Sequence, residues 1–186
     1  MINPLVSVII PSYNQGNFIA RTMESIVNQS YRNIEVIIVD GLSTDNTIEV
    51  LSNYSDHITS LISEKDKGQS DAINKGFNIA SGDIVGWMNS DDLFMKDSIS
   101  SIVEVFKKED NVGFVYGNID VIDEADAIVD RYYGKEVSFP NIFWSLDMPI
   151  PQQGSFWNRK NLKFNLQITT EYNYVLDRDI FLRTIL

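Results

Sequence analysis

The stretch LVSVIIPSYNQGNFI, residues 5–19, decides how the chain is built. Its first residues, LVSVII, are mostly apolar and β-branched, and Pro11 closes the run, which is typical of a buried strand. The polar loop SYNQG follows. Side chains suited to one helical face then recur at Phe18, Ile19, Thr22, Met23 and Ile26. The stretch therefore predicts a strand that leads through a polar loop into a helix.

The same order of elements recurs along the chain. Further strands are predicted at residues 34–39, 58–62, 83–88, 112–116 and 119–122. Helices are predicted from Ser43, as an N-cap, and at residues 72–80, 98–108 and 171–186, whereas residues 131–164 are irregular and aromatic. Strands that alternate with helices predict an α/β fold, a Rossmann-like three-layer sandwich with a mostly parallel central sheet.

Composition excludes several classes of protein. The 186 residues suffice for one domain with a real core, and 44% hydrophobic with 22% charged residues argues against disorder. Lys and Arg number 15 against 26 Asp and Glu, so the net charge is −11. Such a chain repels phosphate backbones, and we expect no nucleic-acid partner. A phosphate-bearing substrate would need a local cation, for which a divalent metal is the obvious choice.

The sequence also bears on location. No apolar run approaches the roughly 20 residues of a membrane helix, and the N-terminus lacks the basic region of a signal peptide. The absence of cysteine fits a reducing compartment. We therefore expect a cytoplasmic protein, with peripheral association at the inner face of the cell membrane left open.

Polar clusters follow three of the predicted strands: Pro11-Ser12-Tyr13-Asn14, Asp40-Gly41 and Asn89-Ser90-Asp91-Asp92. Parallel sheets bind ligands outside the carboxyl ends of their strands. We expect these clusters to meet at one edge. Asp91-Asp92 would suit Mg²⁺ or Mn²⁺, which take oxygen ligands. The alternative for the pair is a turn or a helix cap, and the need of an acidic chain for a cation favours the metal.

Other candidates carry weaker signals. Asp40 either forms the turn before Gly41 or accepts hydrogen bonds from a base or ribose. Lys67 and Gly68 precede a helix whose N-terminus suits a phosphate, although Ser70 or Asp71 could simply cap that helix. Asp177 lies among apolar residues that would raise its pKa toward that of a general base, the alternative being a solvated charge. His57 fits a structural role.

Together these segments resemble the family 2 glycosyltransferases, inverting enzymes of the GT-A fold. The resemblance rests on VSVIIPSYNQGNFI (residues 6–19), SIVNQSYRNIEVIIVDGLSTDNT (25–47), EKDKGQSDAINKGFNIASGDIVGWMNSDD (64–92), PQQGSFWNR (151–159) and LDRDIFLR (176–183). It implies transfer of a sugar from a nucleotide-diphospho-sugar, favoured as a UDP-sugar, to a glycan, lipid-linked or glycoprotein acceptor.

The resemblance also implies residue roles. The nucleotide would contact Pro11, Ser12, Tyr13, Asn14, Asp40, Lys67, Gly68, Asp71, Lys75, Asn89, Ser90 and Asp91. The metal would be held by Asp91 and Asp92, the general base would be Asp177, and the acceptor would lie beside Gln152, Gln153 and Trp157. Residues 1–92 would form the nucleotide-binding half, and residues 93–186 the acceptor side.

The chain departs from the family pattern in places. Asn89 stands where many members have the first aspartate of the metal-binding motif, and Leu176 replaces a frequent Glu before the base. The Gln-x-x-Arg-Trp element is absent, which disfavours a processive synthase. The alternatives are a sugar nucleotidyltransferase and a non-catalytic nucleotide-sugar-binding subunit. Apolar residues near Leu186 lead us to expect further C-terminal chain or a homo-oligomer.

Overall fold

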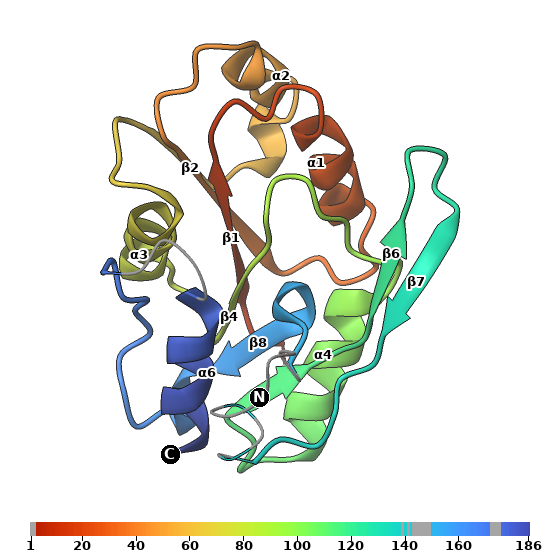
Figure 1. Cartoon of the computed structure of the whole chain (residues 1–186), viewed down its shortest axis with the longest axis vertical. Coiled ribbons are helices and arrows are strands. Elements are labelled where there is room, and N and C mark those ends of the chain that lie inside the picture. Colours follow the sequence, from red (N-terminus) through yellow and green to blue (C-terminus); the bar gives the residue numbers. More distant parts are fainter. Residues whose placement is uncertain (1–2, 139, 141, 143–149, 172–175) are drawn as a thin grey trace.

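The structure, a computed structural model, describes residues 3–138, 140, 142, 150–171 and 176–186. Its central sheet has six strands in the order β3-β2-β1-β4-β8-β5 (Figure 1). These are β1 (Val6–Ser12), β2 (Ile34–Asp40), β3 (Ser60–Ser63), β4 (Ile84–Trp87), β5 (Phe114–Tyr116) and β8 (Ser155–Asn158). Strands β1 to β4 run parallel, and β8 is antiparallel to both of its neighbours. The predicted α/β class with a mostly parallel sheet is confirmed.

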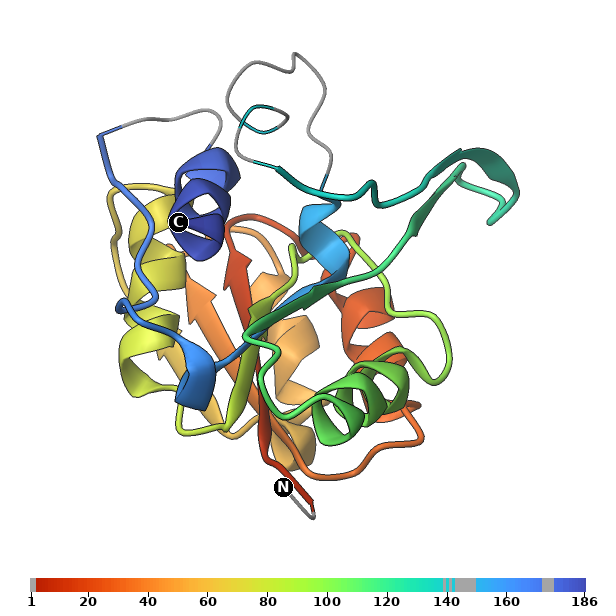
Figure 2. The same ribbon diagram turned by 90° about the horizontal axis from the view of Figure 1, so that it is seen from below.

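Helices cover both faces of the sheet, because successive residues of each buried strand point to opposite faces. On the face of Val8 and Ile10 lie α1 (Ile19–Val27), α2 (Thr47–Ser52) and α4 (Ser98–Lys108). On the face of Ile9 lie α3 (Gln69–Ile79) and α6 (Leu176–Ile185). Figure 2 shows the sheet between these two sets of helices. Of the helices in the described part of the chain, none has the length and apolar character needed to span a membrane.

The register of the sheet aligns the strand ends that matter for a site. Ser12 pairs with Asp40, and Asp40 in turn pairs with Ser63. A side chain at Gly76 would overlap Ile9, so this glycine allows α3 to pack close against β1. The carboxyl ends of β1, β2 and β3 and the start of α3 are thereby held near one another.

Glu35 lies near the opposite, amino-terminal edge of the sheet and is buried there. Its carboxylate accepts hydrogen bonds from Ser81 N at 2.8 Å, from Ser81 Oγ at 2.7 Å and from Ser7 Oγ. Burial opposes ionisation, yet these bonds and one from the Gly82 backbone hold the pKa of Glu35 below its ordinary value. The cluster joins β1, β2 and the turn after α3.

A two-stranded hairpin stands outside the central sheet. It consists of β6 (Ile119–Ile122) and β7 (Ile128–Tyr132), which are antiparallel. Figure 2 shows it projecting away from the body of the domain. Arg21 of α1 forms an ion pair with Asp126 in the hairpin turn. This ion pair ties the hairpin to α1.

The structure differs from the sequence prediction in several places, among them the strand β7 at residues 128–132, which was not predicted. Residues 131–164 were predicted to be irregular, but β8 lies in the middle of the sheet between β4 and β5. Ser43 was the predicted N-cap of the second helix, but α2 begins at Thr47 and Ser43 instead donates to Asp40. The described residues also form the short 3-10 helices η1 (Ser55–His57), η2 (Gln152–Gly154) and η3 (Arg159–Asn161).

Candidate active site

A cavity of about 570 Å³, termed the strand-end cavity, opens at the carboxyl ends of β1, β2 and β4. Its walls come from the loops after these strands and from the start of α3. The lining residues are Pro11, Ser12, Tyr13, Gln15, Gly41, Lys65, Asp66, Gly68, Gln69, Ala72, Asn89, Ser90 and Asp91. The expectation that polar clusters from distant strands meet at one edge is therefore confirmed.

Two buried polar atoms in this wall lack a protein partner. Ser12 Oγ and Gln15 Oε1 have no hydrogen-bond partner in the part of the chain that the structure describes. Buried polar atoms normally have one. A ligand that brings hydrogen-bonding groups would satisfy both atoms.

The start of α3 forms another part of the wall. Gly68 holds the N-cap position with a φ of 108°, a conformation that favours glycine, and no atom lies within 4 Å of where its Cβ would be. A ligand can therefore approach this backbone closely. The helix N-terminus adds positive potential, which suits an anion such as a phosphate.

Asp40 and Asn14, both predicted to contact the nucleotide, do not line the cavity. The Asp40 carboxylate is fully buried and accepts hydrogen bonds from Ser43 N at 2.9 Å and Ser63 Oγ at 2.8 Å. Asn14 N donates to Ser43 Oγ at 2.8 Å, and Asn14 Oδ1 accepts from Thr44 N at 2.8 Å. Both residues position the loops that form the wall.

Three residues around the start of α3 that were predicted to contact the nucleotide do not line the cavity. Lys75 Nζ lies 2.9 Å from Glu64 and 3.3 Å from Asp71, and the hydrogen bond to Glu64 raises the pKa of Lys75. Asp71 also accepts a hydrogen bond from Lys67 N at 3.1 Å. Lys67, Asp71 and Lys75 are thus absent from the cavity lining, which instead contains Lys65. Lys75 is already neutralised by two carboxylates.

The Asp91-Asp92 pair ends the loop after β4. Asp91 is exposed and lines the cavity, whereas Asp92 is half-buried. Thr22 Oγ1 of α1 lies 2.9 Å from the carbonyl oxygens of both Ser90 and Asp92, which fixes the loop. Burial and the charge of Asp91 raise the pKa of Asp92 to about 6, although hydrogen bonds from Asn89 and Gln153 oppose the shift.

These carboxylates fit a divalent cation. A cation beside Asp92 would offset the burial and repulsion that oppose its ionisation. Among the described residues, no group of three or more acidic or histidine side chains could enclose a metal. Mg²⁺ is often held by one or two carboxylates, with the remaining ligands from water and substrate phosphates. The pair is therefore suited to a metal shared with a phosphate-bearing ligand.

Asn89 joins three elements through its amide. Its Oδ1 accepts from Gln69 Nε2 of α3 at 2.8 Å, and its Nδ2 donates to Asp92 Oδ2 at 3.0 Å. The same nitrogen lies 3.4 Å from Gln152 Oε1 of η2. Gln152 in turn donates to the Trp87 carbonyl oxygen at 2.9 Å. Asn89 can donate to Asp92 where an aspartate would repel it.

A second cavity, of about 840 Å³ and termed the hairpin cavity, lies between the loop after β4, α4 and the β6–β7 hairpin. Its lining residues are Arg21, Asp91, Asp92, Leu93, Phe94, Met95, Lys96, Ser98, Ser101, Ile102, Gly117, Asn118, Ile119, Asp120, Val121, Ile122, Asp126, Ile128, Gln153 and Gly154. Gln153, a predicted acceptor residue, is among them. Asp91 lines both cavities.

Trp157 requires a correction. It was predicted to lie beside the acceptor, but its side chain is 0% exposed. Its ring stacks on Trp87 with centroids 5.4 Å apart, and its Nε1 donates to Thr184 Oγ1 at 2.9 Å. Trp157 points inward from β8 and packs between the sheet and α6. A residue with no accessible surface cannot contact an acceptor in this arrangement.

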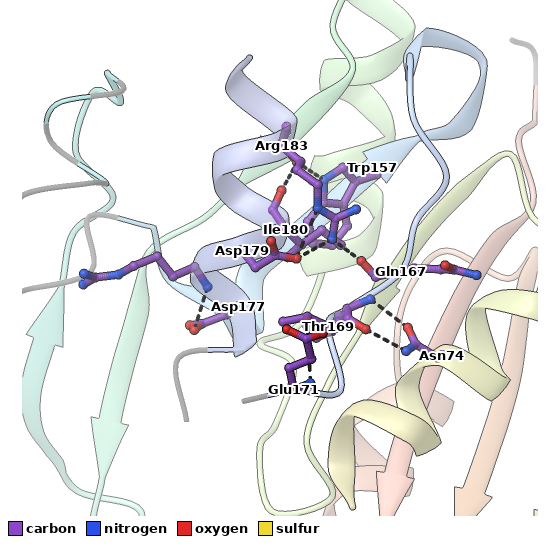
Figure 3. A network of polar contacts seen from close by, with 12 residues as sticks. Asn74, Trp157, Gln167, Thr169, Glu171, Asp177, Asp179, Ile180 and Arg183 are labelled. Carbon is purple, nitrogen blue, oxygen red and sulfur yellow. Dashed lines mark hydrogen bonds and ion pairs between the residues drawn. The ribbon is translucent and has the colours of Figure 1, made fainter. Parts of the chain in front are cut away.

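Asp177 lies in the first turn of α6, half-buried, and lines neither cavity. Burial raises the pKa of its carboxyl group, as the sequence predicted. Figure 3 shows Asp177 to one side of the ion pair between Arg183 and Asp179, whose atoms lie 2.7 Å apart. Its apolar neighbours Tyr174 and Val175 fall outside the described residues.

Some lining residues could not be singled out from the sequence. Lys65, Asp66 and Gln69 lie close to Gly68, which the sequence already indicated as part of a phosphate site. The sequence pattern does not show which of these side chains face a cavity. Ala72 lies one turn into α3 and carries only a packing signal. The helical period places it on the wall once the position of α3 is known.

The chain matches known proteins along most of its length. The profile of Glycosyl transferase family 2 matches residues 7–182. The uncharacterized glycosyltransferase alr2836 of Nostoc sp. is 32% identical over 155 residues, covering 82% of this chain and 47% of that protein. A glucosyltransferase of Escherichia coli, WfgD, is 33% identical over 129 residues, covering 69% and 50%. The chain thus spans about half the length of these two relatives.

Solved structures share the fold. TarS of S. aureus, residues 1–349 in complex with UDP, superposes with a TM-score of 0.78 at 19% identity, over 97% of this chain and 55% of that one. The mannosyltransferase PcManGT of Pyrobaculum calidifontis, in complex with GDP-Man and Mn²⁺, gives 0.67 at 22% identity, over 91% and 48%. From its sequence and its GT-A fold, the chain belongs to glycosyl transferase family 2.

Proposed function

We propose that this chain is the catalytic domain of a metal-dependent, inverting glycosyltransferase. It transfers a sugar from a nucleotide-diphospho-sugar, favoured as a UDP-sugar, to a hydroxyl of a glycan, lipid-linked or protein-linked acceptor. The proposal rests on the strand-end cavity, which combines unpartnered polar atoms, a helix N-terminus and Asp91. Residues 1–92 would bind the nucleotide, and residues 93–186 would supply the acceptor side and the base.

The residues divide the chemistry between them. A metal held by Asp91 and Asp92 would neutralise the charge that develops on the departing diphosphate. Asn89 and Gln153 orient Asp92 through hydrogen bonds. Asp177 takes the proton of the acceptor hydroxyl, and its raised pKa makes it a stronger base than an ordinary aspartate. A single displacement at the anomeric carbon inverts its configuration.

The names of related proteins support this proposal. TarS has been solved with UDP and with UDP-GlcNAc, and PcManGT with GDP-Man and Mn²⁺. WfgD is named a UDP-Glc:α-D-GlcNAc-diphosphoundecaprenol β-1,3-glucosyltransferase. A nucleotide-sugar donor and a divalent metal agree with these names. A lipid-linked acceptor would place the reaction at the cytoplasmic face of a membrane.

A thermal-shift panel tests the proposal. UDP, UDP-Glc, UDP-GlcNAc and GDP-Man are each added with Mn²⁺ or with a chelator, and the melting temperature is recorded. A ligand that binds only the folded state raises apparent stability by mass action, by about 2.7 kcal/mol at one hundred times its Kd. We expect a shift with at least one nucleotide in Mn²⁺ and little shift in chelator. Equal shifts in chelator would contradict the metal, and no shift with any nucleotide would contradict the donor class.

A further inference from the structure

The hairpin cavity is joined to the site proposed for the donor. Asp91 lines both cavities, and Asp92 and Gln153 line the hairpin cavity. A molecule in the hairpin cavity therefore lies beside the carboxylates that would hold the departing diphosphate. Granted the proposed function, the second reactant at such a junction is the acceptor.

The walls of the hairpin cavity are aliphatic over much of their area. Met95 comes from the loop after β4, Ile102 from α4, and Val121, Ile122 and Ile128 from the hairpin. Met95 is 67% exposed and Ile128 is 47% exposed. Aliphatic side chains offer no hydrogen bonds to sugar hydroxyls, but they gain free energy by removing hydrocarbon from water. An exposed apolar surface of this kind typically marks a ligand or partner site.

The polar groups of the cavity are distributed unevenly. Asp91, Asp92 and Gln153 lie where β4 ends and η2 begins, and Lys96, Ser98 and Ser101 follow beside the start of α4. Most of the aliphatic side chains come from the hairpin, which projects away from the sheet (Figure 2). The hairpin charges that line the cavity are paired, Asp126 with Arg21 and Asp120 with Arg131 at 3.0 Å. This distribution matches a molecule with a polar head near the sheet and an apolar chain along the hairpin.

We propose that the hairpin cavity binds the apolar chain of a lipid-linked acceptor, with the polar head of the acceptor on the side of Asp91. The inference rests on the proposed function and narrows its acceptor to one class. It also gives the hairpin a role, because a two-stranded ribbon alone is marginally stable and a bound chain would bury its inner face.

The test uses two simple probes, octyl β-D-glucopyranoside and methyl β-D-glucopyranoside, which share a sugar and differ in the alkyl chain. Binding is measured by titration calorimetry below the micelle concentration. Each buried methylene is worth about fourfold in affinity. We expect the octyl compound to bind at least about 100-fold more tightly than the methyl compound. Equal binding of the two, or no binding of the octyl compound, would overturn the proposal.

Variants locate the binding. Ile128→Asp on the hairpin and Met95→Asp on the opposite wall should each weaken octyl glucoside at least about tenfold. Val129→Asp is the control, because Val129 adjoins Ile128, is 62% exposed and does not line the cavity. It should change affinity less than about twofold. Met95→Asp keeps the test valid if Ile128→Asp disturbs the hairpin, since Met95 lies outside that hairpin.

The outcomes separate this inference from the proposed function. An equal loss in Val129→Asp would mean that the outer hairpin surface binds alkyl chains, for example at a membrane, and would overturn the cavity site. UDP with Mn²⁺ is titrated into the same samples. If the wild-type protein binds UDP but does not prefer the octyl compound, only this inference is contradicted. If the wild-type protein does not bind UDP, the proposed function is contradicted.

Discussion

Glu35 and Asp92 are carboxylates at opposite edges of one sheet, and their surroundings shift their pKa values in opposite directions. Both are withdrawn from water, and burial opposes the ionisation of both. Glu35 receives bonds from two serines and a backbone amide, which together lower its pKa. Asp92 receives two amide donors but faces Asp91, and its pKa rises to about 6. Hydrogen bonds outweigh the effect of burial at Glu35, whereas at Asp92 they do not outweigh burial and the charge of Asp91.

Under the proposed function, this difference would distinguish a structural acid, Glu35, from a functional one, Asp92. A carboxylate that joins elements of a fold is stabilised by the fold itself. One that binds a cation must retain some of its unfavourable charge, because a site already satisfied by the protein gains little from a ligand. Under the proposed function Asp177 would belong to the second group, and burial raises its pKa as well. The comparison can be tested residue by residue.

The largest effect is expected for Asp177→Asn. If Asp177 is the base, transfer to an acceptor that the wild-type protein glycosylates should fall by roughly 10²–10⁴-fold. UDP affinity in Mn²⁺ should stay within about twofold, because the residue acts on the acceptor. Asp179→Asn is a matched control two residues later, where the carboxylate pairs with Arg183. Near-normal turnover in Asp177→Asn would show that Asp177 is not the general base.

The Asp92→Asn variant should lose metal-dependent nucleotide binding. We expect UDP affinity in Mn²⁺ to fall by at least about 10–100-fold, because the loss of a residue that merely orients a metal ligand already costs that much and Asp92 is proposed as a ligand itself. The melting temperature without metal should rise slightly, since burial and Asp91 oppose the charge that is removed. Asp56→Asn removes the same charge from exposed η1 and should change neither quantity. If the melting temperature falls while UDP binding is intact, Asp92 has a structural role like that of Glu35.

Glu35→Gln should show the reverse pattern. The amide nitrogen would face donors from Ser81 and Ser7, so the free energy of unfolding should fall by about 1–3 kcal/mol. UDP binding by the folded protein should not change, because the cluster lies at the far edge of the sheet. Urea denaturation measures the first quantity and calorimetry the second. Glu124→Gln, in the exposed hairpin turn, serves as the control.

The smallest effect concerns pH. The folded pKa of Glu35 lies below its unfolded value, so its stabilisation is present above the unfolded pKa and is lost as pH falls through the folded pKa. The difference in unfolding free energy between wild type and Glu35→Gln should therefore shrink between about pH 7 and about pH 3. A difference that stays constant over this range would mean that shape, and not charge, gives Glu35 its effect.

The sequence predicts the elements whose pattern is local. The strands β1, β2 and β4 are apolar runs that end in polar clusters, and α4 occupies the predicted residues 98–108. The strand-end cavity was predictable for the same reason, since the carboxyl ends of parallel strands share an edge. Asn89, Ser90 and Asp91 could be expected at that edge before any coordinates were known.

What the sequence does not predict depends on contacts between distant segments. The strand β8 is the short segment SFWN, too short to show a period, and it is buried because β4 and β5 lie on either side. The inward orientation of Trp157 follows from that pairing. Lys75 was assigned to a ligand. Its pairing with Asp71, one turn earlier in α3, is local, but Glu64 meets it only once β3 and α3 are in place. The Asp40 carboxylate likewise accepts a hydrogen bond from Ser63, at the end of the neighbouring strand.

The position of β8 has a consequence for how the chain acquires its structure during synthesis. β5 precedes β8 in the chain, yet among the described strands it lies at the edge of the sheet, where it pairs with β8, and β8 separates it from β4. Until residues 155–158 leave the ribosome, β4 has one free edge and Phe114 has no strand beside it. Strands β1, β2 and β3 pair across fewer than about 30 residues, whereas β4 reaches β1 across about 80 residues and β8 reaches β4 only by closing a loop of about 70 residues. Contacts of such separation are formed slowly, and this segment is where premature association between nascent chains would begin.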